Sequence, residues 1–123
     1  RYYGLDEITN KPISFLVSEI VREKVFQLTN DEIPHSLTCI TEQIKKTKNK
    51  YIIHVCIIVD RDALKKIVIG KNGLMVKEIG VRARPEIEDL LDSPVYLEIY
   101  VRTIKKWRDR EKYLQEFGFH DFE

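Results

Sequence analysis

The spacing of apolar residues near the start of the chain predicts an amphipathic helix. They recur every three or four positions, as one face of a helix requires, at Ile13, Leu16, Val17, Ile20, Val21, Val25 and Leu28. Thr9 or Asn10 is suited to cap this helix, and Pro12 is tolerated in its first turn. The polar stretch 29–34 is expected to end it. Residues 1–9 are interpreted as the end of an interdomain linker, which leaves 10–123 as one folded domain.

Two segments that follow are predicted to be strands. Residues 36–45 precede the run 51–59, which is nearly all apolar and rich in β-branched residues. A strand with one exposed face would alternate more cleanly, so 51–59 is expected to lie at the centre of a sheet. The polar link 46–50 is typical of an exposed hairpin loop. Its three lysines at 46, 48 and 50 are interpreted mainly as solvated.

A helical pair and a third strand are predicted next. Asp62 is expected to cap a short helix over 63–69, and a longer helix is expected from about Leu74 to Leu91. Pro85 lies inside the longer helix, where proline removes a backbone hydrogen bond, so a kink and a shifted helix start are expected. The turn Asp92-Ser93-Pro94 ends this helix, and 95–101 alternates as a strand.

The tail is predicted to form a short closing helix over 107–117. Trp107, Leu114 and Phe117 are expected to pack back on the core, with Gly118 at the C-terminal cap. The order is therefore helix, strand, strand, helix, helix, strand, helix. This order predicts an α+β domain in which helices pack on a three-stranded sheet.

Composition and charge narrow the class of protein. The chain has 123 residues, of which 43% are hydrophobic, a size and content that suit one folded domain. It contains no apolar run of the ~20 residues that a membrane span needs. It opens with Arg1, and its only methionine is Met75, so a piece of a longer protein is expected. The net charge is only +1, but residues 61–84 carry seven basic and two acidic side chains. Such a block suits a polyanion, and a solvated helix face is an equal alternative.

No constellation in the sequence indicates catalysis. Cys39 and Cys56 fit no zinc or redox spacing and are expected to be reduced core thiols, although a disulfide stays open if their strands pair. The histidines His35, His54 and His120 lie far apart, and His54 is expected to be a satisfied core residue. No G-x-x-x-x-G-K-[ST] motif occurs, so this chain is not expected to bind GTP by that route.

The segment Gly70-Lys71-Asn72-Gly73 carries the main functional signal. Its two glycines join the predicted helices, allow positive φ angles and leave no Cβ in the way of a ligand backbone. The next helix would present its N-terminal N–H groups to a phosphate, and Lys71 adds a cation. Apolar residues beside the loop would give a floor for bases: Ile67, Val68, Ile69, Val76 and Ile79. The alternative is a tight helix–helix turn in which glycine only provides sharpness.

This arrangement resembles the KH domain, in which a GXXG loop clamps single-stranded RNA. The order of elements resembles the type II KH fold. Stretches along nearly the whole chain are similar to the C-terminal KH domain of the Era-family ribosome-assembly GTPases. The clearest are Ser18-Glu19-Ile20-Val21-Arg22-Glu23-Lys24 and Val68-Ile69-Gly70-Lys71-Asn72-Gly73. Softer matches are 3–10, 32–36, 79–84, 95–101 and the segment from Trp107 to Phe119.

The resemblance implies a function and a set of contacts. Era-type proteins join a GTPase domain, which holds GTP and Mg, to this KH module, which binds the single-stranded 3′ end of small-subunit ribosomal RNA. The implied partners are that RNA, the small ribosomal subunit and the protein's own GTPase domain. The implied location is the bacterial cytoplasm; nothing in this chain indicates association with the inner membrane. The implied RNA-binding residues are Gly70, Lys71, Asn72, Gly73, Ile69, Ile79, Lys77, Arg82, Arg84 and Arg22, and strand 51–59 would form a groove wall.

Two other functions stay open at this point. A KH-like domain that has lost RNA binding could dock a protein partner, such as its own GTPase domain. A type II KH module also occurs in other ribosomal or transcription proteins. The local positive charge and Lys71 favour RNA binding over the protein-docking alternative.

Overall fold

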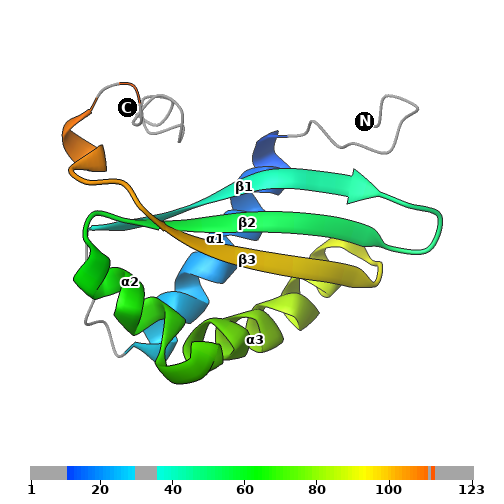
Figure 1. The fold of residues 1–123 in the computed structure, drawn as a ribbon. Helices are drawn as coiled ribbons and strands as arrows, with labels where there is room; N and C mark the ends of the chain where they lie inside the picture. The colour runs from blue at the N-terminus through cyan, green and yellow to red at the C-terminus, as the bar shows by residue number, and fades with distance from the viewer. Residues whose placement is uncertain (1–10, 30–35, 111, 113–123) are drawn as a thin grey trace.

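In the computed structural model, the three α-helices lie on one face of a three-stranded sheet (Figure 1). The structure describes residues 11–29, 36–110 and 112. The elements follow the chain as α1 (Lys11–Leu28), β1 (Leu37–Lys46), β2 (Tyr51–Val59), α2 (Asp62–Ile69), the 3-10 turn η1 (Lys71–Gly73), α3 (Leu74–Leu91), β3 (Val95–Thr103) and the 3-10 turn η2 (Trp107–Asp109). The predicted order of helices and strands is confirmed as far as β3.

The strand order β1-β2-β3 places β2 at the centre of the sheet. β1 and β2 pair as an antiparallel hairpin, and β3 returns parallel to β2 after the two helices. The prediction that 51–59 is the central strand is therefore confirmed. A register shift between Thr41 and Gln43 makes a bulge in β1.

Alternation along β2 separates two apolar clusters. Tyr51, Ile53, Val55, Ile57 and Val59 face the helices and join the main core. Cys56 and Ile58 face the other way, where Trp107 covers them and is itself only 1% exposed. The indole N–H of Trp107 donates to the carbonyl of Ser36 at 3.1 Å. Packing of Trp107 onto the sheet is confirmed. The predicted closing helix does not begin at Trp107, because Trp107–Asp109 form only a 3-10 turn and Arg110 after it is extended. Leu114, Phe117 and Gly118 lie outside the described residues.

The two cysteines lie on opposite faces of the sheet. Cys39 pairs in register with Ile57, and Cys56 pairs with Ile40. Both thiols are free and buried, as expected. Because they lie on opposite faces of the sheet, they cannot form the disulfide that pairing of their strands had left open. Burial raises the pKa of the Cys56 thiol to about 11 and raises the pKa of Cys39 further. Both thiols are therefore neutral at physiological pH.

On α1 and α3, the residues that pack against the sheet recur every four positions. Val17, Val21 and Val25 are fully buried on α1, and Ile79, Ala83 and Ile87 are fully buried on α3. Leu16 was expected in the buried stripe but is 45% exposed, because Val17 takes the position that faces the sheet. The stem of Lys24 is buried between α1 and α3, and its ammonium binds the carboxylate of Glu86. That hydrogen bond raises the pKa of Lys24.

Three local predictions are tested by the ends of the helices. Asp62 lies inside α2, and Arg61 occupies the cap position without a side-chain hydrogen bond, so the predicted aspartate cap is wrong. α3 begins at Leu74 and continues through Pro85 to Leu91, so the expected shift of its start does not occur. Pro85 is tolerated because it lies on the exposed side of α3. Asp92, at φ 52° and ψ 49°, ends α3 as predicted. The caps predicted at Thr9 or Asn10 lie outside the described residues.

Candidate nucleic-acid interface

The loop between α2 and α3 has a backbone that few residues can adopt. Gly70, Asn72 and Gly73 all have positive φ, at 78°, 56° and 74°. Gly70 combines its φ with a ψ of 172°, a region that is essentially restricted to glycine. A Cβ at Gly70 would also lie 2.6 Å from the Cβ of Met75 and 2.8 Å from its backbone nitrogen. Gly73 meets no such obstacle, so only its left-handed conformation favours glycine there.

The loop leaves its two polar side chains at the surface. Lys71 and Asn72 are exposed, and neither pairs with another side chain in the part of the chain that the structure describes. The hydrogen bond from Gly73 N to Gly70 O, at 3.1 Å, closes the turn. Gly73 occupies the cap position of α3 and offers no side chain to its N–H groups. An anion can therefore approach both the start of α3 and the Lys71 ammonium.

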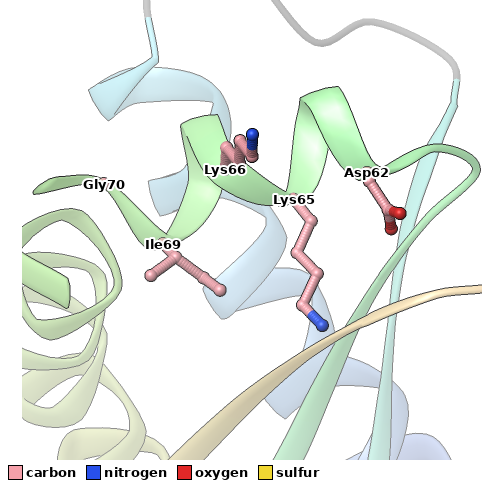
Figure 2. Close-up of a pocket in the computed structure, with 5 residues that line it drawn as sticks. All are labelled: Asp62, Lys65, Lys66, Ile69 and Gly70. Carbon is pink, nitrogen blue, oxygen red and sulfur yellow. The ribbon is translucent and has the colours of Figure 1, made fainter. Parts of the chain in front are cut away.

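Two hollows lie near the loop: Gly70 lines the first, and the lining of the second begins at Val76, three residues after Gly73. The first has a volume of about 420 Å³ and is lined by Asp62, Lys65, Lys66, Ile69 and Gly70. Figure 2 shows the side chains of Lys65 and Ile69 on the same side of α2, with Lys65 directed toward β3. The hollow combines the apolar side chain of Ile69 with two lysines and the carboxylate of Asp62. Such a mixture suits a nucleotide, whose base is flat and apolar on its faces and whose phosphate is charged.

The second hollow, of about 310 Å³, lies between α3 and the edge of β3 that pairs with no other strand in the described residues. Its apolar lining comes from Val76, Val81, Leu97 and Ile99, its cations are Lys77 and Arg84, and Glu98 is its acidic residue. Gly80 carries no side chain, so it does not narrow the second hollow. A Cβ added to it would lie 3.7 Å from Ile99 Cδ1. We call the two hollows and the loop between them the groove. Its width beside β3 depends on Gly80.

Several predicted site residues line the groove, and others do not. Ile69 and Gly70 line the first hollow, and Lys77 and Arg84 line the second. Arg84 also pairs with Glu88, at 3.4 Å on the exposed side of α3. Lys71, Asn72 and Gly73 lie in the loop that joins the hollows.

Two predicted cations lie away from the groove lining. Arg82 is exposed on α3 and pairs with Glu78 at 2.8 Å. Arg22 lies on α1, where it pairs with Glu19 and covers the ring of Phe26 at 4.8 Å. Neither residue lines either hollow.

The expectation that Ile79 lines the base groove is wrong. Ile79 is 0% exposed, because its helical position aligns it with Ala83 and Ile87 toward the core. Val68, also expected in the apolar floor, is fully buried too, whereas Ile67 is 40% exposed. The groove uses the neighbouring stripe of α3, made of residues 76, 80 and 84. These residues also recur every four positions. The sequence therefore contained this second stripe, displaced by one residue from the buried apolar stripe 79, 83 and 87.

Residues 51–59, which were expected to form a groove wall, line neither hollow. Residues 51–59 form β2, which is covered on both sides by β1 and β3. The wall is β3, the edge strand, and its contribution of Leu97 and Ile99 was missed. The apolar alternation of 95–101 carried this signal, but only the parallel return of β3 beside α3 shows which side is open. Lys65 and Lys66 were likewise missed as lining residues.

His54 is not a core residue, contrary to expectation. Its side chain is 28% exposed on the sheet face away from the helices, and its Nε2 lies 3.2 Å from Glu98 Oε1. No group of His, Cys, Asp and Glu residues that could hold a metal ion occurs within 11–29 and 36–110. In the same part of the chain, no helix is long and apolar enough to cross a membrane.

Comparison with known proteins gives a family and two related structures. The model of the KH domain family matches residues 32–108. A variant of Aquifex aeolicus Era bound to GDP·AlF4⁻ is 46% identical, with a TM-score of 0.82 over 91% of this chain and 38% of the Era chain. Era in complex with MgGDPNP and nucleotides 1506–1542 of 16S ribosomal RNA is also 46% identical, with a TM-score of 0.82 over 88% of this chain and 37% of the other. The match is to the C-terminal region of Era, and the chain spans less than two fifths of either protein.

Proposed function

Because this chain belongs to the KH domain family and has the type II order of elements, we propose that it is an RNA-binding module. Its target would be the single-stranded 3′ end of small-subunit ribosomal RNA. The observation that carries this proposal is the loop Gly70–Gly73, which opens between two hollows that both contain apolar and cationic side chains. The complex of Era with nucleotides 1506–1542 of 16S ribosomal RNA supports the choice of target.

The groove suits a single strand through two kinds of contact. The RNA backbone would pass along the loop, where phosphates meet Lys71 and the start of α3. Bases would turn toward Ile69, Val76 and the edge of β3. Lys77 and Arg84 would neutralise neighbouring phosphates, while Arg22 and Arg82 would act at most at longer range.

The whole protein would place this module in ribosome assembly. The 123 residues include no GTPase domain, so GTP and Mg would bind elsewhere in an Era-like protein, and the state of that domain would govern RNA binding. The module's partners would be the ribosomal RNA, the small ribosomal subunit and that GTPase domain. Its location would be the bacterial cytoplasm, with any association at the inner membrane depending on parts other than this domain. The segment 1–9 would be the end of the interdomain linker.

A binding titration tests the proposal. We expect RNA with the sequence of nucleotides 1506–1542 to bind with micromolar or better affinity, and a scrambled RNA of equal length to bind at least about ten-fold more weakly. If about three phosphates are neutralised, the slope of log K against log salt should be about −2. Equal affinity for the two RNAs would contradict the proposed target. No binding to either RNA at low salt would contradict RNA binding and favour a protein-docking domain.

A further inference from the structure

Among the residues that the structure describes, only Trp107 and its neighbours cover the sheet face opposite the helices, and they do so at one end. Trp107 packs over Cys56 and Ile58, and Figure 1 shows its turn, η2, at the end of the sheet away from the β1–β2 hairpin. Tyr96, near the hairpin end, is 49% exposed, and Tyr100, which pairs in register with Cys56 farther along β2, is 44% exposed. Both residues point away from the helices, because their register partners Ile52 and Cys56 do so. Two large aromatic side chains therefore remain accessible on one edge strand.

Positive charge lies beside Tyr96. The ammonium of Lys50 lies 5.8 Å from the ring centre of Tyr96. Lys45 pairs in register with Ile52 and therefore lies on the same face. Residues 43–52 contain no acidic side chain, so the charge beside Tyr96 on the β1–β2 side is positive, whereas the carboxylates of Glu98 and Glu42 lie near Tyr100. We call Lys45, Lys50, Ile52, Tyr96 and Tyr100 the platform. Aromatic rings flanked by cations are the chemistry that binds single-stranded nucleic acid by stacking.

Glu98 links the platform to the groove. It lines the second hollow at the edge of β3, and its carboxylate accepts hydrogen bonds from Tyr100 at 2.7 Å and Tyr96 at 3.4 Å. His54 lies 3.2 Å from the same carboxylate and meets the ring of Tyr100 edge-on at 5.9 Å. The hydrogen bond to Glu98 also raises the pKa of Tyr100. Glu98 thus anchors both phenol groups and leaves substantial ring surface exposed.

We propose that RNA leaving the groove crosses the edge of β3 and continues over the platform, where nucleotides stack on Tyr96 and Tyr100. This inference rests on the proposed function and lengthens its footprint. The two tyrosines are four residues apart along β3, or about 13 Å, which about two to three nucleotides of extended single-stranded RNA would span. The occupant is a flanking single-stranded segment of the same RNA, because β3 belongs to both surfaces.

The test compares a short RNA with an extended one. Overlapping hexanucleotides from 1506–1542 are first titrated against the chain to find the one that fills the groove. That sequence is then lengthened by about six natural nucleotides on either side. The wild-type chain should bind the better of the extended RNAs at least about ten-fold more tightly than the hexanucleotide.

Variants of the tyrosines separate stacking from other effects. Tyr96→Ala with Tyr100→Ala should reduce the length-dependent gain to less than about three-fold and leave hexanucleotide binding unchanged. Tyr96→Phe with Tyr100→Phe should keep the gain, since phenylalanine still stacks. Phe15→Ala is a matched control, because Phe15 is 43% exposed on α1, on the helical side of the sheet.

The outcomes distinguish this inference from the proposed function. If no hexanucleotide and no extended RNA binds, the proposed function fails, and the platform proposal fails with it. If a hexanucleotide binds but the alanine variant keeps the full length-dependent gain, only the platform proposal is overturned. If the alanine variant keeps the full length-dependent gain but binds small ribosomal subunits more weakly than the wild-type chain, the platform would be assigned to a protein partner instead.

Discussion

Two exposed turns of this chain carry the same lysine–asparagine pair in different settings. Lys48-Asn49 lies in the β1–β2 hairpin, and Lys71-Asn72 lies in the loop between α2 and α3. Thr47 closes the hairpin through a hydroxyl hydrogen bond to the carbonyl of Lys50 at 2.8 Å and accepts one from the Lys50 N–H at 3.1 Å. No residue of the hairpin has a positive φ, whereas three of the four loop residues do.

The surroundings of the two turns differ as much as their backbones. The loop lies between two hollows and precedes an α-helix whose first turn has no side-chain cap. Neither hollow is lined by a residue of the hairpin turn. Equal charge and equal exposure therefore do not make equal sites. Under the proposed function, glycine conformation and the neighbouring apolar surface would make the loop a clamp for an RNA backbone and leave the hairpin a solvated turn.

The largest effect is expected from Gly70→Ala, which breaks the loop conformation directly. The added Cβ would collide with backbone and side-chain atoms of Met75, and alanine rarely adopts the φ and ψ of Gly70. We expect a loss of about 3 kcal/mol in the free energy of unfolding and loss of RNA binding. Urea denaturation with an RNA titration measures both. Wild-type stability would show that the loop does not need this conformation.

Gly73→Ala should have a smaller effect and so separates strain from collision. Gly73 is left-handed, but a Cβ there meets nothing within 4 Å. The expected loss is about 1–2 kcal/mol, from conformational strain alone. The two alanine variants are compared in one urea experiment, in which Gly73→Ala should be the more stable protein. The reverse order would contradict the geometry assigned to Gly70.

Gly80→Ala tests the groove wall beside the loop and should stabilise the protein. Its Cβ would make an ordinary contact with Ile99, and alanine favours a helix interior over glycine by about 1 kcal/mol. Gly80→Leu, by contrast, would fill the second hollow and should weaken RNA binding. Thermal unfolding and RNA titration of both variants check this pair. A destabilised alanine variant would mean that α3 and β3 need closer packing than the structure gives.

Thr47→Ala should have the smallest effect, since it loosens the hairpin only. The lost hydrogen bonds are exposed, so we expect a cost of about 0.5–1 kcal/mol. Binding of a groove-filling hexanucleotide should stay at the wild-type value. A clear loss of hexanucleotide binding would place the hairpin in the groove site and remove the contrast between the turns.

Local patterns were sufficient to predict much of this fold. The period of the apolar residues located α1, β1 and β2, and the turn Asp92-Ser93-Pro94 marked the end of α3. The loop Gly70–Gly73 was also found from sequence, because its glycines are adjacent in the chain. The nearly continuous apolar run 51–59 identified the central strand, although its face away from the helices is covered only where Trp107 packs on Cys56 and Ile58.

Local patterns could not show which way side chains point once the helices and strands pack against one another. Ile79 is apolar and near the loop, and only the docking of α3 on the sheet shows that it faces the core. The groove wall depends on which strand forms the edge, a property of the parallel pairing between β2 and β3. His54 was misassigned for the same reason, because an apolar strand can still expose one face at its open end.

One measurement tests the central claim, that loop shape and not charge makes the RNA site. Lys71→Asp with Asn72→Asp and Lys48→Asp with Asn49→Asp change the net charge equally, at two exposed turns. Both are titrated with the same groove-filling hexanucleotide at about 0.15 M salt, where charges farther than about 8 Å are largely screened. We predict that the loop variant loses at least about fifty-fold in affinity while the hairpin variant stays within about three-fold, with both folded by thermal unfolding. Equal losses in the two variants, or wild-type binding by the loop variant, would contradict the account.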